Sequence, residues 1–594
     1  RTGVRTGIVP DRDGTFLSSR RPAFWSADYH ARRRKKERPK WEEFQAYAFF
    51  TQFDLNDMNR GLYWFADHGG GWHQSKTVDA QEFIRKGGTT SVVLNLVAEP
   101  VEYRSDQPIV FGIIPHPARP LPRHFRLLER ASPKEEPKFF QAYGSAFKPW
   151  PMDPRSHRGT GATGLSMKLF PAPDPDELDN PSPSWDYAER CIRGMKDVQP
   201  KGFRSMYLSN YWFSCRAGAY DHWEWRGGPT SQVTHSQSFV DYLCWEMNEW
   251  IRRDIFDAIY LDECYEAPSR NVEAGQACRL PDGSVQPGVT LWGFRQLMKR
   301  WRNIFHQNDL EPMFTCHLTR SMMYCGMTFV DSYLDGEGHP TITARSGSFV
   351  DRLSLTRAEV LQSGRMWGVT PFFMVSIWEG GLGMGKGWNP HKRWSWRMAR
   401  GAMSLLAHFE NGTTYTDQGG YVYRHYWNDV LRWGAGDLGV PFHSYWNNGD
   451  YLEVEGQGKA TLVSFYQKAN RILLIASNRK KEIWEIRVKL NLDRLGLKGK
   501  LNVVHWDTGY PPAKGDDILS KVELARLKNI SPPEEDLLNA KAARDNGFEE
   551  TEDLVEKLEA DEEKGKDNPR LEGNVLILPT RPQDFRIVSI EEVE

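Results

Sequence analysis

The chain has 594 residues, enough for roughly two to four domains with sizeable cores, and it carries 77 Lys and Arg against 78 Asp and Glu. This balance of charge offers no general electrostatic basis for binding nucleic acid. No apolar run approaches the roughly 20 residues needed to cross a bilayer, so no membrane span is expected. The 23 Trp would suit stacking on sugar rings, although large cores and sheet packing use Trp equally well.

Several chemistries lack their sequence signatures. The seven Cys are odd in number and show no CxxC or Cys/His ligand spacing, so we expect neither a disulfide framework nor a zinc site. HExxH, P-loop, dinucleotide-binding and GxSxG motifs are also absent. We therefore expect no metal and no cofactor. Asn411-Gly-Thr and Asn529-Ile-Ser match the glycosylation sequon, a short pattern that often occurs by chance. The compartment therefore stays open, with an extracellular or periplasmic location favoured. The oligomeric state stays open.

The N-terminal part divides into a basic arm and a run of short strands. Residues 1–40 are Arg-rich, densest at Arg32–Arg38, and are interpreted as a solvated arm rather than a nucleic-acid segment. Residues 41–130 predict a partial antiparallel β-sandwich, because short apolar runs alternate with Gly, Asp and Pro signals. The predicted strands cover residues 46–53, 61–66, 91–96 and 109–114. A Pro-rich connector follows at 115–122.

Residues 131–435 change period and alternate strands with helices. Strands are predicted at 139–143, 203–209, 255–261, 312–317, 328–334, 366–375 and 405–409, and helices at 185–198, 239–253, 291–305, 353–362 and 394–406. This alternation predicts an α/β fold, a (β/α)8 TIM-like barrel in which only seven strands are recognisable. A doubly wound sheet is the alternative, but no glycine-rich phosphate loop supports it.

Residues 436–594 return to a strand pattern that predicts a second β-sandwich. Its predicted strands cover residues 451–454, 461–466, 472–476, 484–490, 501–506, 575–578 and 585–590. A charged stretch rich in Ala, Glu, Leu and Lys interrupts them at about 520–566, and it is expected to be helical. Its acidic side chains are interpreted as solvating that helix rather than binding a cation.

The most informative feature is a pair of adjacent carboxylates, Asp262 and Glu263, directly after the apolar run Ile255–Leu261. Burying unpaired carboxylates is costly, whereas the carboxyl end of a barrel strand is where catalytic groups lie. Neighbouring side chains of a strand point to opposite faces, so both acids can face one ligand only if the chain turns here. In the alternative interpretation, Asp262 caps the next segment and Glu263 is simply solvated.

Further polar and aromatic residues follow other predicted strands. We expect these strand ends to line one mouth of the barrel, and we expect the residues there to contact a sugar. The candidate substrate contacts are Asn210, Tyr211, Trp212, Tyr260, His317, Asp335, Glu337 and Trp378. Packing roles, or for the Asp335-Gly-Glu337 loop a turn or a cation site, are the structural alternatives.

Four segments together resemble glycoside hydrolase family 123 and its relatives: Arg60–Asp67, Asn95-Leu, Phe111–Pro122 and Tyr260–Glu263. The resemblance covers roughly residues 45 to 430. The related hexosaminidases that use an adjacent Asp-Glu pair usually show His-x-Gly-Gly before it, whereas this chain has Ala258-Ile-Tyr-Leu. The resemblance therefore points to family 123, which contains β-N-acetylgalactosaminidases with a sandwich before the barrel.

The resemblance implies an exo-acting glycosidase with a substrate-assisted, retaining mechanism. It would release a β-linked N-acetylhexosamine, with N-acetylgalactosamine as the expected sugar, from an oligosaccharide or polysaccharide. The resemblance also implies Glu263 as the acid/base and Asp262 as the partner of the sugar's 2-acetamido group. Two alternatives stay open. Glu263 could act with Glu337 or Asp335 as a conventional carboxylate pair on a sugar without the acetamido group, or the chain could bind carbohydrate without catalysis.

Overall fold

The computed structural model describes part of the chain, in two compact units. Unit 1 comprises Arg1–Pro122, Pro137–Tyr333 and Ser363–Val369, and unit 2 comprises Arg123–Glu136, Leu334–Gln362 and Thr370–Glu594. The described residues are 3–4, 7–8, 14–18, 48–102, 108–122, 125–126, 205–210, 223, 234–254, 258–318, 323–336, 350, 353–362, 364–374, 400–414, 419–506 and 568–593. The predicted strand 139–143, helix 185–198 and charged insertion 520–566 lie outside them.

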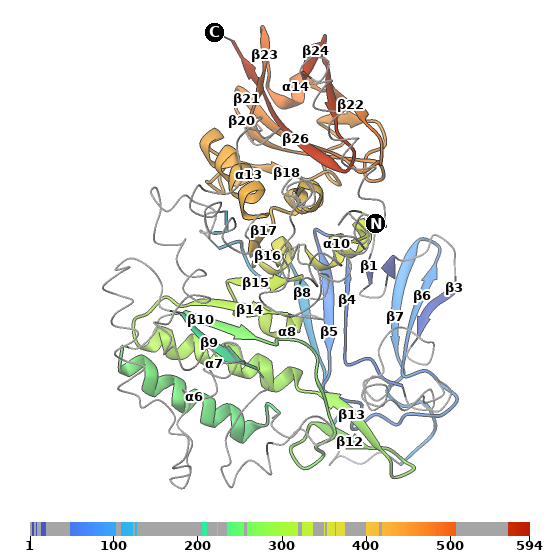
Figure 1. Cartoon of the computed structure of the whole chain (residues 1–594). Helices are drawn as coiled ribbons and strands as arrows, with labels where there is room; N and C mark the ends of the chain where they lie inside the picture. Colours follow the sequence, from blue (N-terminus) through green and yellow to red (C-terminus); the bar gives the residue numbers. More distant parts are fainter. Residues whose placement is uncertain are drawn as a thin grey trace, which may run out of the picture. The chain divides into compact units, whose positions relative to one another are not determined.

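Unit 1 contains two antiparallel sheets near the N-terminus (Figure 1). The first has the order β2-β1-β4-β5-β8, with β1 Gly3–Val4, β2 Gly7–Ile8, β4 Gln52–Asn56, β5 Gly61–Phe65 and β8 Gly112–His116. The second has the order β3-β6-β7, with β3 Gly14–Ser18, β6 Gln81–Lys86 and β7 Thr89–Leu94. The predicted arm thus contributes strands to both sheets, and the strand predicted from residue 46 begins only at Gln52.

Aromatic side chains fill the space between these two sheets. Phe53 and Trp64 come from the first sheet, and their rings stack at 5.1 Å between centroids. Phe83 comes from the second sheet and meets the Phe53 ring edge-on at 4.9 Å. All three side chains are buried. Aromatic pairs in these geometries add to the stabilisation from buried apolar area, so this packing explains why the two sheets associate as a sandwich.

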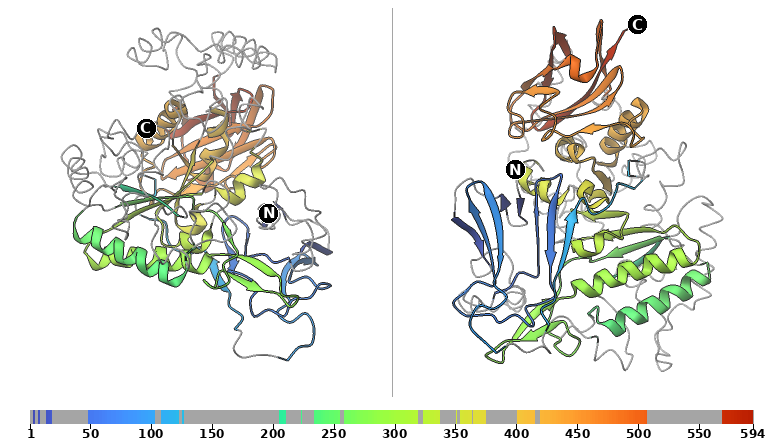
Figure 2. Two further views of the ribbon diagram at one scale, coloured as in Figure 1. Left: turned by 60° about the horizontal axis from the view of Figure 1, so that its bottom comes forward. Right: turned by 180° about the vertical axis from the view of Figure 1, so that it is seen from behind.

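The other part of unit 1 is a parallel sheet covered by helices. Strands β9 Ser205–Ser209, β10 Ala258–Asp262 and β14 Met313–His317 lie in the order β14-β10-β9. Helices α6 Gln237–Arg252 and α7 Leu291–Gln307 run side by side along one face of these strands (Figures 1 and 2). The short helices α8 Tyr324–Met327 and α11 Gly364–Trp367 also belong to this unit.

Helix α6 shows why the sequence folds this way. The Ser236 hydroxyl accepts a hydrogen bond from the Phe239 backbone N–H, which caps the first turn. Phe239, Leu243 and Met247 recur at helical spacing and are buried. They share one apolar core with Ile259 of β10. The periodicity that predicted a helix over 239–253 therefore identifies the face that packs on the sheet.

One small antiparallel sheet of three strands was not predicted. It consists of β11 Pro268–Ser269, β12 Ala277–Arg279 and β13 Val285–Val289, in the order β11-β13-β12. Its turn contains Asp282-Gly283, a typical hairpin signal, and Gly283 has the positive φ of 81° that such a turn requires. The signal was present, but the strands on either side are too short to show a clear alternation.

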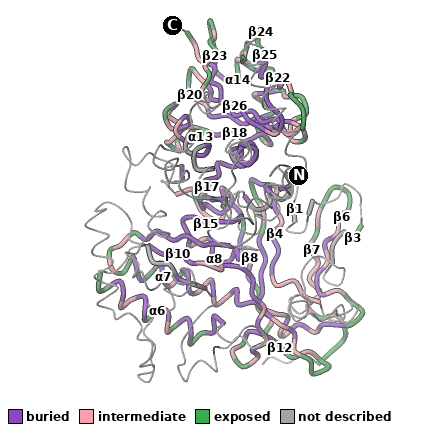
Figure 3. The backbone as a smooth tube through the Cα atoms, viewed as in Figure 1, coloured by how far each residue is buried: buried purple, intermediate pink, exposed green. Residues whose placement is uncertain are grey.

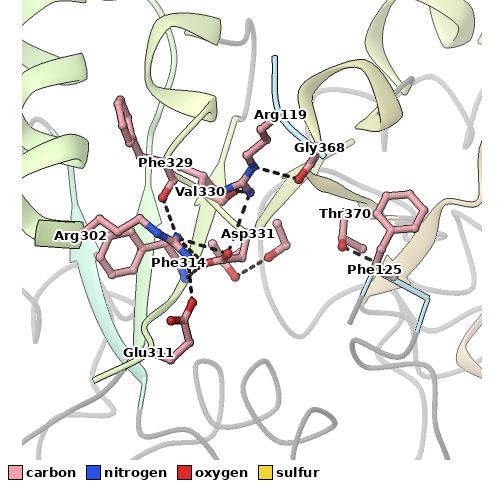
Figure 4. A network of polar contacts seen from close by, with 12 residues as sticks. Arg119, Phe125, Arg302, Glu311, Phe314, Phe329, Val330, Asp331, Gly368 and Thr370 are labelled. Atoms are coloured by element: carbon pink, nitrogen blue, oxygen red, sulfur yellow. Dashed lines mark hydrogen bonds and ion pairs between the residues drawn. The ribbon is translucent and has the colours of Figure 1, made fainter. Parts of the chain in front are cut away.

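A network of charges lies at the amino-terminal end of β14 (Figure 4). Asp331 is buried, and its carboxylate accepts hydrogen bonds from Arg302 Nη1 at 3.1 and 3.2 Å and from the Phe314 N–H at 2.8 Å. Arg119 of the Pro-rich connector lies 3.9 Å from the same carboxylate and donates to the carbonyls of Val330 and Gly368. The connector is thus fastened to the sheet.

Replacing Asp331 with Asn should lower the free energy of unfolding by about 2 kcal/mol. Removing one member of a fully buried ion pair costs roughly 3–5 kcal/mol, but here the Arg302 and Arg119 side chains keep 16% and 21% of their surface exposed. Urea unfolding measures the change. Glu311→Gln is the matched control, because that carboxylate is 76% exposed and also contacts Arg302. Equal losses in both variants would contradict a structural role for Asp331.

Unit 2 contains further strands and helices from the middle of the chain, where strands and helices alternate. Strands β16 Thr370–Met374 and β17 Gly412–Thr414 pair in parallel. Helices α10 Leu355–Leu361 and α13 Gly419–Trp433 belong here, while strand β15, Ser332–Asp335, spans the division between the units. The strand predicted at 405–409 is wrong: residues 400–406 are helical and the 3-10 helix η2, Ala407–Phe409, continues them.

The C-terminal part of unit 2 is an antiparallel β-sandwich, as predicted. One sheet has the order β18-β20-β21-β26-β23, with β18 Phe442–His443, β20 Thr461–Lys468, β21 Arg471–Asn478, β23 Leu501–His505 and β26 Asp584–Glu592. The other has the order β19-β22-β25-β24, with β19 Leu452–Val454, β22 Trp484–Leu490, β24 Arg570–Glu572 and β25 Val575–Thr580. A short helix, α14 Leu492–Leu495, follows β22.

The two sheets of this sandwich enclose an apolar core. Phe465 of β20 and Leu474 of β21 meet Ile486 of β22 and Leu578 of β25 there, and all four are fully buried. Figure 3 shows the strands β20 and β26 as buried over much of their length. Side chains of β22 alternate between buried and exposed, which is the period expected for a strand with one face on a core.

Where the structure describes the middle of the chain, strands and helices largely alternate as predicted, but a closed barrel is not seen. Among the described residues, the parallel ladders β14-β10-β9 and β16-β17 do not close on themselves. The antiparallel sheets at either end of the sequence agree with the predicted flanking strands. No helix in the described ranges is long and apolar enough to cross a bilayer.

Candidate functional site

Three neighbouring parallel strands of unit 1 end at one edge of their sheet, and each ends in a polar residue. Leu261 of β10 pairs with Leu208 of β9 and with Cys316 of β14. Asp262 and His317 are the next residues along β10 and β14, so they lie level with Ser209 at the end of β9. Asn210 directly follows β9. Parallel strands place these residues together because their carboxyl ends share an edge.

The chain turns directly after Asp262. Glu263 adopts a φ of 60°, a left-handed conformation that costs a non-glycine residue roughly 1–3 kcal/mol. The Glu263 N–H donates to Asp262 Oδ1 at 2.7 Å, and the Glu263 carbonyl accepts from the Tyr265 N–H at 2.8 Å. These bonds hold the turn in place. The strand does not continue through Glu263, which is the condition under which both acids can face one ligand.

His317 is the direct partner of the Asp262 carboxylate. Its Nδ1 lies 2.9 Å from Asp262 Oδ1, and the two side chains are 4% and 15% exposed, respectively. The His317 backbone carbonyl accepts the Cys264 N–H at 2.7 Å. The end of β14 thus contacts the residues on both sides of Glu263. The carboxylate of Asp262 is anchored, yet part of its surface stays accessible.

Asn210 contributes from the end of β9. Its backbone N–H donates to the Asp262 carbonyl at 3.0 Å, and its Nδ2 lies 3.4 Å from the Glu263 carbonyl. Asn210 is buried, and within the described part of the chain its Oδ1 has no hydrogen-bond partner. A buried amide oxygen costs free energy unless something donates to it. This oxygen is therefore an acceptor that a ligand could use.

Tyr260 lies one layer below these residues in the sheet. It is 1% exposed, and its ring centroid is 6.0 Å from that of His317. The structure places Tyr260 under the strand-end residues, where it supports His317 rather than forming the outer surface. Its sequence-based assignment as a substrate contact is weakened by this burial, because a buried ring has little surface to offer a sugar.

Asp335 ends strand β15 and belongs to unit 2. It is buried, and its Oδ1 accepts the Gly336 N–H at 2.7 Å while its Oδ2 accepts Gln362 Nε2 at 3.3 Å. Gln362 Oε1 in turn accepts Asn411 Nδ2 at 2.5 Å. Since Asn411 is buried and bonded in this way, the sequon at Asn411 is not a surface acceptor for a glycan. Tyr211, Trp212, Glu337 and Trp378 lie outside the described residues.

Two cysteines complete this edge, and sequence reasoning gave them no role here. Cys264 is buried, and its thiol donates to the Leu261 carbonyl at 3.2 Å. Burial raises the pKa of the Cys264 thiol well above its usual value, and the contact with Cys316 and the charges of Asp262 and Glu263 act in the same direction. The thiol therefore stays protonated and packs beneath the turn instead of acting as a nucleophile.

The arrangement brings the Asp262 carboxylate, the His317 ring and the Asn210 amide together where the chain turns at Glu263. In the described ranges, no group of three or more His, Cys, Asp or Glu side chains is arranged to hold a metal ion. Carboxylates at a turn can exchange protons with a ligand and stabilise positive charge that develops on it. Those are the chemical abilities that the described residues provide.

No family model matches the chain, and no curated protein matches it in sequence. Among solved structures, a maltogenic α-amylase from Thermotoga neapolitana is similar over 69% of this chain and 81% of that chain, with 8% identity and a TM-score of 0.36. A GH27 β-L-arabinopyranosidase from Geobacillus stearothermophilus is similar over 69% and 78%, with 9% identity and a TM-score of 0.38. A family 18 chitinase from Crocus vernus is similar over 42% and 78%, with 13% identity and a TM-score of 0.25. Scores this low assign neither a fold nor an activity.

Proposed function

We propose that the chain is a glycoside hydrolase that releases a β-linked N-acetylhexosamine, with N-acetylgalactosamine as the expected sugar. The observation that carries the proposal is the turn at Glu263, which follows Asp262 at the carboxyl end of β10. In the proposal, the two adjacent carboxylates serve one ligand because the strand does not continue past Asp262. The resemblance of the Tyr260–Glu263 segment to family 123 supplies the chemistry expected of such a pair.

In the proposed reaction, the carbonyl oxygen of the sugar's 2-acetamido group attacks the anomeric carbon. Glu263 donates its proton to the glycosidic oxygen as the bond to the leaving group breaks. The Asp262 carboxylate accepts the acetamido N–H and stabilises the positive charge of the cyclic oxazolinium. Glu263 then removes a proton from water, which attacks the anomeric carbon and reopens the ring with net retention of configuration.

The adjacency of the two acids favours this route over a conventional pair. Retaining glycosidases with a protein nucleophile place two carboxyl groups about 5–5.5 Å apart on opposite sides of the bond that breaks. Asp262 and Glu263 are neighbours on one turn, and Asp262 is anchored by His317. Neither acid has to reach the anomeric carbon when the acetamido oxygen is the nucleophile.

The remaining predicted contacts would bind the sugar. Asn210 offers its buried Oδ1 to a hydroxyl group of the ligand. Tyr211, Trp212 and Trp378 are proposed to stack on sugar rings of an oligosaccharide or polysaccharide, since aromatic faces suit the apolar faces of such rings. Asp335 and Glu337 are proposed as further polar contacts.

A thiazoline that mimics the cyclised sugar tests the proposal. The chain should hydrolyse an aryl β-N-acetylgalactosaminide, and the thiazoline should inhibit competitively with a Ki at least 100-fold below the KM, because it resembles the transition state. The matched aryl galactoside, which lacks the acetamido group, should not be cleaved.

Two other outcomes would overturn the proposal. Cleavage of the galactoside without inhibition by the thiazoline would indicate a conventional pair, Glu263 with Asp335 or Glu337. Binding of glycans without turnover of any glycoside across a broad panel would indicate a carbohydrate-binding protein.

A further inference from the structure

Two of the described residues place a nitrogen against the same oxygen of the Asp262 carboxylate. Oδ1 accepts the Glu263 N–H at 2.7 Å and lies 2.9 Å from His317 Nδ1. The first donor is the backbone N–H of Glu263, which remains when the side chain at this position is replaced by any residue except proline. The second comes from a different strand, β14, and depends on the identity of one side chain. His317 is therefore the only one of the two donors that a substitution can remove cleanly.

His317 is itself fixed on several sides. Its side chain is 4% exposed, its carbonyl accepts the Cys264 N–H, and its ring lies 6.0 Å from that of Tyr260. Because its Nδ1 faces Asp262 Oδ1, this nitrogen is directed at a protein neighbour and not at a sugar. The side chain is well placed to orient a neighbour, because its own rotamer is locked by packing.

We propose that His317 is a positioning residue for Asp262, in place of the substrate contact predicted from the sequence. It fixes the plane of the Asp262 carboxylate relative to the turn, because its Nδ1 lies 2.9 Å from Asp262 Oδ1. The inference rests on the proposed function for its catalytic consequence. The coupling of His317 to Asp262 does not depend on the proposed function.

Three substitutions separate positioning from packing. His317→Asn keeps an N–H donor near the position of Nδ1, whereas His317→Gln places its donor near Nε2 and misses Asp262 Oδ1. His317→Leu removes the donor. We expect kcat to fall about 100-fold in the Leu and Gln variants, the size of loss that a misplaced catalytic group produces, with KM changed by less than about threefold. The Asn variant should stay within about tenfold of wild type.

A double-mutant cycle with Asp262→Asn supplies the decisive readout. When Asp262 is already Asn, adding His317→Leu should change kcat and the thiazoline Ki by less than about twofold, because the interaction it removes is already altered. Equal activity of the Asn and Gln variants, or independent effects of the Leu and Asp262 substitutions, would overturn the inference. If His317→Leu does not fold, two measurements still decide. One compares His317→Asn with His317→Gln, and the other is the double-mutant cycle that combines His317→Gln with Asp262→Asn.

The same experiment distinguishes failure of the inference from failure of the proposed function. If the wild type cleaves only the galactoside, the proposed function is wrong, and the cycle run on that substrate still decides whether His317 acts through Asp262. If the wild type cleaves no glycoside, the cycle is run on the dissociation constant of a bound glycan. If the wild type binds no glycan either, both the proposed function and the catalytic role of His317 are refuted.

Discussion

Replacing Glu263 with Gln should reduce the turnover of an aryl β-N-acetylgalactosaminide by at least about 1,000-fold and leave the fold intact. The amide has nearly the same shape but cannot donate a proton to the leaving oxygen or accept one from water. General acid–base catalysis contributes roughly 10²- to 10⁴-fold, and in the proposed reaction Glu263 acts in both steps. Steady-state kinetics measure the loss, and circular dichroism checks the fold.

The leaving group provides an internal control for the Glu263 variant. A dinitrophenyl leaving group needs little protonation, so the loss in its first step should be much smaller than for a methyl glycoside. Glu311→Gln changes an exposed carboxylate that is distant in sequence from Glu263, and it should leave kcat within about twofold of wild type. Near-wild-type turnover of the methyl glycoside by Glu263→Gln would remove the acid/base assignment.

Acid should destabilise unit 2 through a buried histidine, His408. Its Nδ1 and Nε2 lie 2.8 Å from the hydroxyls of Ser464 and Ser477, and the residue is fully buried. Burial, reinforced by the charge of Arg479, lowers the pKa of His408 to about 3 from the usual 6.5. The unfolded chain therefore binds a proton below pH 6.5 that the folded chain does not bind until about pH 3.

Between pH 6.5 and about pH 3, the free energy of unfolding therefore decreases as the pH is lowered. One proton per pH unit corresponds to roughly 1.4 kcal/mol, so about 3 kcal/mol should be lost between pH 6.5 and pH 4. The pKa values of Asp67 and Glu246, which burial raises to about 7, act with the opposite sign. The contribution of His408 is therefore isolated by comparing a variant with the wild type and not by the shape of one curve.

Urea unfolding midpoints of His408→Gln and the wild type, measured from pH 7.5 to pH 4, test this expectation. The variant should start less stable and lose less stability on acidification, so the two curves should converge. His306→Gln, at a half-exposed position near the end of α7, should run parallel to the wild type. A His408 variant that also runs parallel would contradict a neutral, buried His408.

The sequence was informative where a local pattern decides the structure. The alternation in β22, the helical spacing in α6 and the apolar run that ends at Asp262 all depend on residues close together in the chain. The turn at Glu263 was also foreseeable, because two charged residues cannot extend a buried strand without cost.

Contacts between distant residues could not be foreseen. The pairing of Asp262 with His317 depends on the register of β10 against β14, which no local pattern encodes. The apolar run 405–409 resembled a strand, but it completes a helix whose buried residues pack in the core of unit 2. Helix α13 was missed because its many aromatic residues favour strands, while their spacing matches a helix.

The role of the acetamido group is tested most directly by a series of aryl substrates in which the N-acetyl methyl group carries none to three fluorine atoms. Fluorine withdraws electron density from the carbonyl oxygen that should attack the anomeric carbon. We predict that kcat/KM falls steeply with each added fluorine. A flat series on an enzyme that cleaves these substrates would show that this oxygen is not the nucleophile, and would contradict catalysis by Asp262 and Glu263 as described.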